Sequence, residues 1–216
     1  MSLIINRNLK IIALIESESV NHAISNLQRD IVKSCEETQE EGIELHLMKK
    51  EMKDESFSLQ VDAGKLFLYA ADSLGFIYGI YEISRSILGI MNFWFWNDQQ
   101  IVMKQGYEVA EDFSFTSKPY PVRFRGWFVN DEVLLHTWSV DREKDKPWEM
   151  VFEALLRCEG NMIIPGTDRN SEHYRKIASR MGLYITHHHA EPLGAEMFAR
   201  AYPDLNPSYV EHSDKF

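Results

Sequence analysis

The stretch Pro-Val-Arg-Phe-Arg-Gly-Trp-Phe-Val-Asn-Asp-Glu at residues 121–132 is the part of the sequence that decides the fold. β-Forming residues alternate along it, which predicts a strand and places Arg123, Arg125 and Trp127 on one face. Arginine is rare in a packed layer unless an anion or a hydroxyl-rich group meets it there. The strand ends in an amide and two carboxylates, Asn130–Glu132. The pattern therefore indicates polar chemistry at the end of a strand.

The same rhythm of strand, polar loop and helix then returns twice. The expected units are a strand over 122–128 with a helix from about 145, a strand over 161–165 with a helix over 171–181, and a strand over 183–186 with a helix over 195–201. Three such units are typical of the opening of a (β/α)8 barrel, whose site lies at the carboxyl ends of its strands. No Gly-rich phosphate turn follows any of these strands in the sequence, which disfavours a dinucleotide-binding doubly wound sheet.

The sequence ahead of Pro119 predicts a separate α+β unit. Its expected elements are strands over 10–15, 43–48, 57–61 and 65–70, a hairpin turn at 62–64, and helices over 20–31 and 72–88. Strands followed by segregated helices are typical of a small α+β sandwich. We therefore expect an α/β chain of two domains, with the sandwich over 1–118 and a partial barrel over 119–216.

Four motifs carry a resemblance to a known family. Residues 70–79 have the pattern A-x-D-x-x-G-x-x-Y-G, which resembles the small domain ahead of the catalytic barrel in hexosaminidases and α-glucuronidases. With Arg125-Gly126, Asn130-Asp131-Glu132 and residues 188–192 in that order, nearly the whole chain resembles the α-glucuronidases of glycoside hydrolase family 115. The resemblance implies an enzyme that needs no cofactor and removes glucuronic acid, or its 4-O-methyl ether, from xylan. Glucuronoxylan or its oligosaccharides would be its partner.

The length of the chain departs from that family, because the sequence ends at Phe216 after about three barrel units. A barrel of this kind takes roughly 250 residues. We therefore expect an N-terminal fragment whose catalytic acid would lie on later strands, so no catalytic pair is assigned and the chain alone should be inactive. An unfinished parallel sheet also predicts self-association.

The candidate substrate-binding residues are polar and follow the three strands. They are Arg125, Asn130, Asp131, Asp168, His188, His189 and Glu191. Arg125 resembles the hydroxyl-binding arginine of related hexosaminidases, and its planar fork suits a uronate carboxylate; a salt bridge to Asp131 or Glu132 is the alternative. Adjacent side chains diverge, so we expect Asp131 rather than Glu132 to face the ligand. For Asp168, a site role and a surface pair with Arg169 stay equally open.

The histidine run His187–His189 is similar to a zinc ligand set with Glu191 nearby. Consecutive strand residues point to alternate faces, so one metal would take His187 and His189 but not His188. We therefore expect His188 or His189 to hydrogen-bond a ligand, with Glu191 orienting the ring. A metal-dependent hydrolase is one alternative function, and a carbohydrate-binding or assembly module without catalysis is another.

Composition sets further expectations. The net charge of −10 and the lack of a basic patch argue against a nucleic-acid partner, and an anionic sugar would need a local cationic pocket. No apolar stretch approaches a membrane span and no signal-peptide pattern is present, so no membrane partner and a cytoplasmic setting are expected unless a leader has been removed. Cys35 and Cys158 are expected as free thiols. The aromatic run at 93–96 suggests carbohydrate stacking, but it follows a predicted buried helix and is therefore interpreted as the seam between the two domains.

Overall fold

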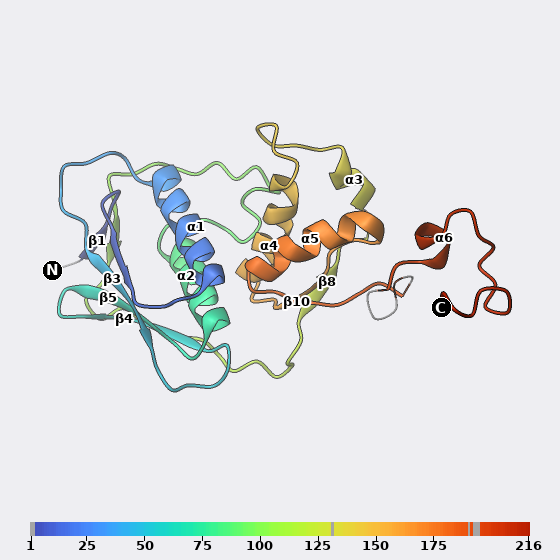
Figure 1. The fold of residues 1–216 in the computed structure, drawn as a ribbon. Coiled ribbons are helices and arrows are strands. Elements are labelled where there is room, and N and C mark those ends of the chain that lie inside the picture. The colour runs from blue at the N-terminus through green and yellow to red at the C-terminus, as the bar shows by residue number, and fades with distance from the viewer. Residues whose placement is uncertain (1–2, 131, 190, 192–194) are drawn as a thin grey trace.

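The protein consists of two sheet-containing units with helices between them (Figure 1). The computed structural model describes residues 3–130, 132–189, 191 and 195–216, without the side chains of 132–133 and 168–170. Helices α1 (Glu18–Ser34) and α2 (Ser73–Ser86) lie between the first sheet and the second unit. None of the helices in this described part has the length and apolar run that a bilayer crossing requires.

The first sheet has the strand order β2-β3-β5-β4-β7. Its strands are β2 (Lys10–Ala13), β3 (Glu44–Lys49), β4 (Phe57–Asp62), β5 (Lys65–Ala70) and β7 (Ser114–Thr116). β2, β3 and β5 are parallel, whereas β4 pairs antiparallel with β5 and β7. A separate antiparallel pair joins β1 (Leu3–Ile5) to β6 (Tyr107–Val109). The predicted strands and hairpin are confirmed, but β1, β6 and β7 are three residues each, too short for a periodic signal.

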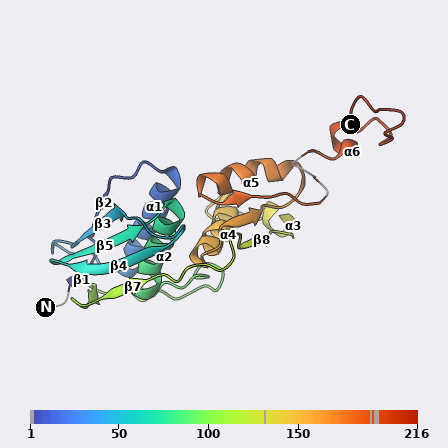
Figure 2. The same cartoon turned by 90° about the horizontal axis from the view of Figure 1, so that it is seen from below.

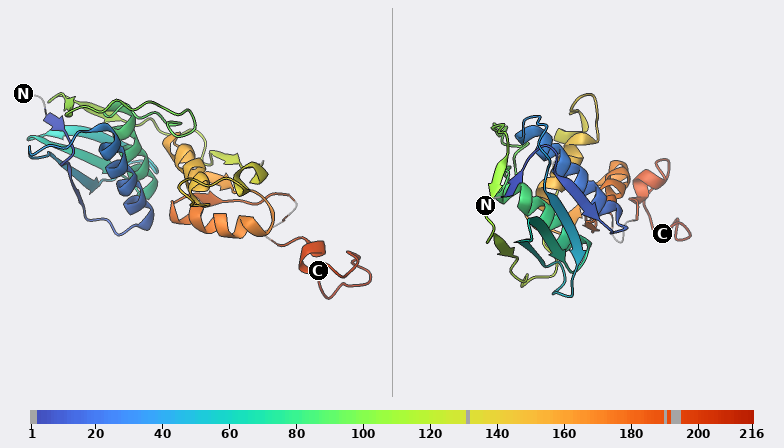
Figure 3. Two further views of the ribbon diagram at one scale, coloured as in Figure 1. Left: turned by 90° about the horizontal axis from the view of Figure 1, so that it is seen from above. Right: turned by 90° about the vertical axis from the view of Figure 1, so that its left-hand side faces the viewer.

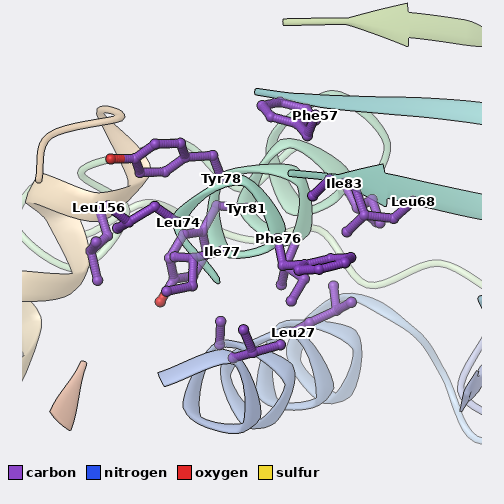
Figure 4. Close-up of a cluster of buried hydrophobic side chains, with 14 of the residues drawn as sticks. Leu27, Phe57, Leu68, Leu74, Phe76, Ile77, Tyr78, Tyr81, Ile83 and Leu156 are labelled. Carbon is purple, nitrogen blue, oxygen red and sulfur yellow. The ribbon is translucent and has the colours of Figure 1, made fainter. Parts of the chain in front are cut away.

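Helix α2 is the centre of the hydrophobic core. Figure 4 shows Phe57 and Leu68 of the sheet, Leu27 of α1 and Leu156 of the second unit arranged around it. All four side chains are buried. One core therefore runs from the first sheet through α2 into the second unit, which fixes the two units against each other.

The A-x-D-x-x-G-x-x-Y-G motif explains how α2 is held. The Asp72 carboxylate caps the helix by accepting from the Gly75 N–H at 2.9 Å. A Cβ at Gly75 would lie 2.5 Å from the Ser56 carbonyl oxygen, so only glycine fits this approach. Further along, the Tyr78 hydroxyl donates to the Gly160 carbonyl at 3.1 Å, across to the second unit. The motif therefore builds the seam between the two units.

The second sheet is parallel and has the order β10-β9-β8. Its strands are β8 (Gly126–Phe128), β9 (Met162–Ile164) and β10 (Tyr184–Ile185). Helices α4 (Lys146–Arg157) and α5 (Asp168–Arg180) contact each other, which puts them on one face of the sheet, as Figures 2 and 3 show. The prediction of three adjacent parallel strands with helices on one side is confirmed. The domain boundary after residue 118 stays a prediction.

The first strand of this sheet is shorter than predicted. It begins at Gly126, and Val122 and Phe124 ahead of it are exposed lead-in residues rather than strand. A Cβ at Gly126 would lie 2.2 Å from the Met162 carbonyl oxygen, so β8 and β9 approach closely where the strand starts. The alternation that we extended back to Arg123 therefore stops at this glycine.

Three further boundaries differ from the prediction. Helix α5 begins at Asp168 after the N-cap Thr167, earlier than the apolar periodicity indicates, because the first turn of a helix needs no apolar face. A short helix, α3 (Glu132–His136), occupies part of the predicted loop 133–146. The third expected helix is only α6 (Phe198–Ala201), which lies away from both sheets in Figure 1. Both cysteines are free thiols, as predicted.

Candidate functional site

Strands β8, β9 and β10 end at one edge of the second sheet, which we call the carboxyl edge. The Val129 N–H donates to the Ile164 carbonyl at 3.0 Å, and the Thr186 N–H donates to the Ile163 carbonyl at 3.0 Å. Strand pairing therefore continues just past the strand ends. The segments that leave the sheet here are 129–130, 165–167 and 186–189.

The three histidines divide between two directions. The His187 Nδ1 atom lies 3.0 Å from Arg175 Nη1 on α5, and because arginine can only donate, Nδ1 accepts this bond. The His188 ring stacks on Phe128 of β8 with a centroid distance of 5.1 Å. His189 lies with its ring centroid 3.7 Å from that of His188. The His188 and His189 rings thus contact each other over the end of β8, while His187 is hydrogen-bonded to helix α5.

Glu191 closes the turn that follows these rings. Its backbone N–H donates to the His188 carbonyl at 2.9 Å, and the residue is only 6% exposed. Asn130 is exposed two residues after Phe128, the ring on which His188 stacks. The structure therefore brings Asn130, His188, His189 and Glu191 to the carboxyl edge, as predicted. Their role in binding substrate stays a prediction.

The side chains of two other predicted site residues are not described. Asp131 lies outside the described residues. Asp168 is the first residue of α5, so it does not lie in the predicted loop, and its side chain is not described.

The metal alternative required His187 and His189 to face one centre. His187 instead contacts Arg175, and His189 lies against His188. Within the described ranges, no group of three or more His, Cys, Asp or Glu side chains is placed to hold a metal ion. The described side chains therefore give this alternative no ligand set.

The predicted position of Arg125 at the carboxyl edge is wrong. The residue precedes β8, at the opposite, amino end of the sheet. Its Nε donates to the Glu159 carbonyl at 2.8 Å, and its Nη1 donates to the Val122 and Arg123 carbonyls at 3.0 and 3.3 Å. Its Nη2 donates to two partners in the first unit, the Glu55 carboxylate and the Tyr78 hydroxyl. All five donors of this guanidinium are thus occupied, which leaves none for a sugar.

Asn161 completes this arrangement, and we call Glu55, Tyr78, Arg125 and Asn161 the amino-end clamp. The fully buried Asn161 amide donates to Glu55 Oε1 at 2.9 Å and accepts from the Arg125 backbone N–H at 2.8 Å. Burial, reinforced by the negative charge of Glu55, raises the pKa of the Tyr78 hydroxyl, which therefore stays protonated and donates. A hollow of about 790 Å³ borders the clamp, and the clamp residues Glu55 and Arg125 on its wall are already bonded to each other.

A second ionic network joins the two units through α1 and α4. Arg157 donates through Nε to Glu153 at 2.7 Å and through Nη2 to Asp30. Arg29 contacts the same two carboxylates, at 2.7 Å each, and Trp94 Nε1 donates to Glu153 at 3.1 Å. We call Arg29, Asp30, Trp94, Glu153 and Arg157 the α1–α4 network. Burial alone would raise the pKa of Glu153, but the two arginines hold it at about 2.

This network was not predicted from the sequence, although a signal for it exists. Glu153 and Arg157 stand four apart on α4, between apolar residues of the buried stripe. A charged pair inside an apolar stripe needs buried partners of opposite charge. The interpretation of the aromatic run as the seam holds for Trp94 and Trp96, whose indole N–H groups donate across to Glu153 and to the Met150 carbonyl.

Solved structures resemble the chain over most of its length. A family GH115 4-O-methyl-α-glucuronidase, BtGH115A, with specificity for decorated arabinogalactans, matches with a TM-score of 0.79 and 22% identity, covering 99% of this chain and 33% of that one. The chitobiase of Flavobacterium johnsoniae matches with a TM-score of 0.55 and 14% identity, covering 94% and 34%. The β-hexosaminidase of Streptomyces plicatus matches with a TM-score of 0.58 and 13% identity, covering 86% and 42%. At these identities the likeness shows the fold alone.

The chain spans about a third of the length of the first two of these structures. No curated protein sequence matches it. The model of glycosyl hydrolase family 115, in contrast, matches residues 117–216, which contain all three parallel strands and the carboxyl edge. The family match in this half and the structural likeness over the whole chain agree: residues 117–216 match the model of glycosyl hydrolase family 115, and the fold of the whole chain is similar to that of a family GH115 enzyme.

Proposed function

We propose that the chain is the N-terminal part of a glycoside hydrolase that releases glucuronic acid, or its 4-O-methyl ether, from the side chains of xylan. The observation that carries the proposal is the family match of residues 117–216, because this region contains the parallel β/α units and their carboxyl edge. Active sites of barrel enzymes lie at that edge. The first sheet and its helices support the site from the other end.

The carboxyl edge offers polar groups suited to a sugar acid. An exposed amide at Asn130 and imidazoles at His188 and His189 can donate to hydroxyl or carboxylate oxygens. The net charge of −10 makes such local donors necessary for an anionic sugar. Arg125 has no part in this proposal, because its donors are occupied at the amino end.

The proposal includes closure of the sheet into a (β/α)8 barrel by further strands. Cleavage of a glycosidic bond takes two carboxyl groups that flank it, and the proposal assigns the catalytic acid to those later strands. We therefore expect the 216 residues alone to bind sugar weakly and to release none. The lead-in and strand side chains Phe124, Phe128 and Tyr184 are 37–47% exposed, and we expect self-association through this region in the isolated chain.

The test compares two proteins on the same polysaccharides. The 216-residue chain and the product of the same gene read beyond codon 216 are incubated with 4-O-methylglucuronoxylan and with a decorated arabinogalactan, and released uronic acid is measured. We expect release by the longer protein only, with xylan the better substrate. Release by the 216-residue chain would contradict the fragment proposal. Binding without release by the longer protein would favour a module without catalysis.

A further inference from the structure

An aromatic pocket of about 480 Å³ lies apart from the carboxyl-edge residues and the amino-end clamp. It forms where the loop after α2 meets the segment between α3 and α4. Its walls and rim include Trp94, Phe95, Trp96, Trp138, Asp98 and Gln100. Trp94 and Trp96 also belong to the seam between the two units, but the proposed function does not use this pocket.

Two of the tryptophans are anchored to α4. Trp94 Nε1 donates to Glu153 Oε1 at 3.1 Å, and Trp96 Nε1 donates to the Met150 carbonyl at 3.2 Å. An indole whose N–H is occupied and whose ring is half-buried keeps one orientation. These two rings therefore form a fixed floor rather than a mobile surface.

Trp138 is held differently, with its ring presented to solvent. It stacks on Phe95 at a centroid distance of 5.8 Å and meets Trp96 edge-on at 5.5 Å. The residue is nevertheless 39% exposed. Within the described ranges its indole N–H has no hydrogen-bond partner, in contrast to those of Trp94 and Trp96. The packing fixes Trp138 in place while leaving part of its ring and its donor for a ligand.

The polar rim is built on a tight turn. Asn97 N–H donates to the Phe93 carbonyl and Gln99 N–H to the Trp94 carbonyl, both at 2.9 Å, and Asp98 has a positive φ of 47°. The Gln99 amide is occupied by Met91 and Gly89, so it shapes the loop. Asp98 is exposed, and its carboxylate makes no hydrogen bond or ion pair within the described residues. Gln100 Nε2 donates to the Asp98 carbonyl at 3.3 Å, which leaves the second N–H and the carbonyl oxygen of its amide, beside the exposed Asp98 carboxylate, for a ligand.

We propose that this aromatic pocket binds a neutral pyranose oligosaccharide, stacked on Trp138 and hydrogen-bonded by Asp98 and Gln100. One face of a pyranose ring carries only C–H groups, which pack on an indole, while its hydroxyl groups point outward to amide and carboxylate partners. A neutral ligand fits better than an acidic one, because the rim carries a carboxylate and the protein has a net charge of −10. The volume of about 480 Å³ lies within the range of roughly 300–1,000 Å³ that is usual for small-ligand sites.

The position of the pocket relates it to the carboxyl edge. Phe93, in the same loop, stacks on Trp127 of β8 at 5.9 Å, and Trp138 lies in the segment that connects β8 to α4. The loop that carries the pocket is thus packed, through Phe93, against the strand that leads to Asn130. If the proposed function holds, the pocket receives the neutral main chain of the polysaccharide while the acidic side chain goes to the carboxyl edge. The choice of xylan as the main chain rests on that proposed function; binding of a neutral oligosaccharide does not.

The test measures binding without turnover. The 216-residue chain is titrated with xylohexaose by calorimetry, alongside Trp138→Ala, Trp138→Phe and Gln100→Ala. Removing the indole should weaken binding at least about tenfold, the phenyl ring should retain part of the affinity, and Gln100→Ala should weaken it without disturbing the aromatic packing. Tyr209→Ala is the matched control, because Tyr209 is an aromatic residue that is 66% exposed near the C-terminus. It should bind as the unchanged chain does.

The outcomes separate this inference from the proposed function. Absence of binding at millimolar xylohexaose would contradict the proposal that the aromatic pocket binds a neutral oligosaccharide. Equal affinity of the unchanged chain and both Trp138 variants would contradict it as well. Free glucuronic acid should not compete with xylohexaose, since it belongs at the carboxyl edge. If binding depends on Trp138 and Gln100 but the longer protein releases no uronic acid, the proposed binding site is supported and the proposed hydrolase function is contradicted.

Discussion

The two ends of the second sheet carry similar polar residues in opposite states. At the amino end, Arg125 has all its donors occupied and Asn161 is fully buried and bonded to Glu55. At the carboxyl edge, Asn130 is exposed and makes no hydrogen bond within the described residues, and His189 is exposed against the ring of His188. A polar side chain whose bonds are all made within the protein holds the fold together, whereas one facing solvent at a strand end is available to a ligand.

This contrast shows that residue type and motif are not enough to identify an arginine that binds a ligand, because its donors must also be free. Arg125 has the residue type and the Arg-Gly motif expected of a sugar-binding group. Every hydrogen bond of its guanidinium is nevertheless made within the protein. The α1–α4 network extends the same logic, because helix α4 runs from the carboxyl edge back to the amino end, where Arg157 meets Asp30 of the first unit. We therefore expect substitutions at the amino end to change stability and substitutions at the carboxyl edge to change ligand binding.

The largest expected effect is at Arg157. The side chains of Arg157 and Asp30 are 0% exposed, so Arg157→Ala leaves buried carboxylates with one cation fewer. We expect a loss of about 3–5 kcal/mol in the free energy of unfolding, measured by urea denaturation. Lys176→Ala is the control, since its pair with Glu172 is 69% and 66% exposed and is worth at most about 0.5 kcal/mol. Equal effects of the two substitutions would mean that the α1–α4 network does not stabilise the seam.

Acid should weaken the same network at a defined pH. The folded pKa of Glu153, about 2, lies below the ordinary value of 4.5, so its contribution is fully present above pH 4.5 and is lost as the pH falls from there toward 2. The size is on the order of 3 kcal/mol. Unfolding free energies measured between pH 7 and pH 3 should fall, and Glu153→Gln should make this fall shallower while lowering stability at pH 7. If the dependence of the unfolding free energy on pH is the same in Glu153→Gln, Glu153 is not the group whose protonation weakens the protein.

The amino-end clamp should give a smaller loss. The Arg125 and Glu55 side chains are 21% and 13% exposed, so Arg125→Ala should cost about 2–3 kcal/mol, less than a fully buried pair. Arg125→Lys keeps the charge but cannot reach all the partners, and we expect about 1–2 kcal/mol. Both values come from urea denaturation. Binding of glucuronic acid should be unchanged wherever the variant is folded, and a selective loss of binding in Arg125→Lys would restore this arginine to the site.

The sequence predicts the elements that have a long apolar period, the hairpin of β4 and β5, and the parallel adjacency of β8, β9 and β10. The stripe on α4 and the alternation in β4 and β5 each extend over more than one turn or pleat, so burial follows from spacing. The position of Arg125 could not be predicted, because its partner Glu55 lies 70 residues away on another unit. Spacing along the chain holds no information about such a contact. The place of the histidine turn was predictable, because the strand before it lies parallel to β8 in the same sheet and the two strands end at one edge.

The smallest expected effect on stability is at the carboxyl edge. Asn130 and His189 are exposed, so Asn130→Ala and His189→Ala should each change the free energy of unfolding by less than about 0.5 kcal/mol. In the longer protein the same substitutions should lower kcat/KM for release of uronic acid by at least about tenfold, the loss expected for a well-placed hydrogen bond to a charged group.

Measuring both the unfolding free energy and kcat/KM of each variant tests whether the two ends of the sheet have different roles. Thr137→Ala is the control, an exposed polar residue in the segment after α3, and it should change neither stability nor kcat/KM. Variants of Asn130 or His189 that unfold more easily, with kcat/KM lost only in proportion to the unfolded fraction, would show that the carboxyl edge is a structural cluster like the amino-end clamp. A fall in kcat/KM at full stability would instead assign these two side chains to the substrate, since nothing else about the folded protein has changed.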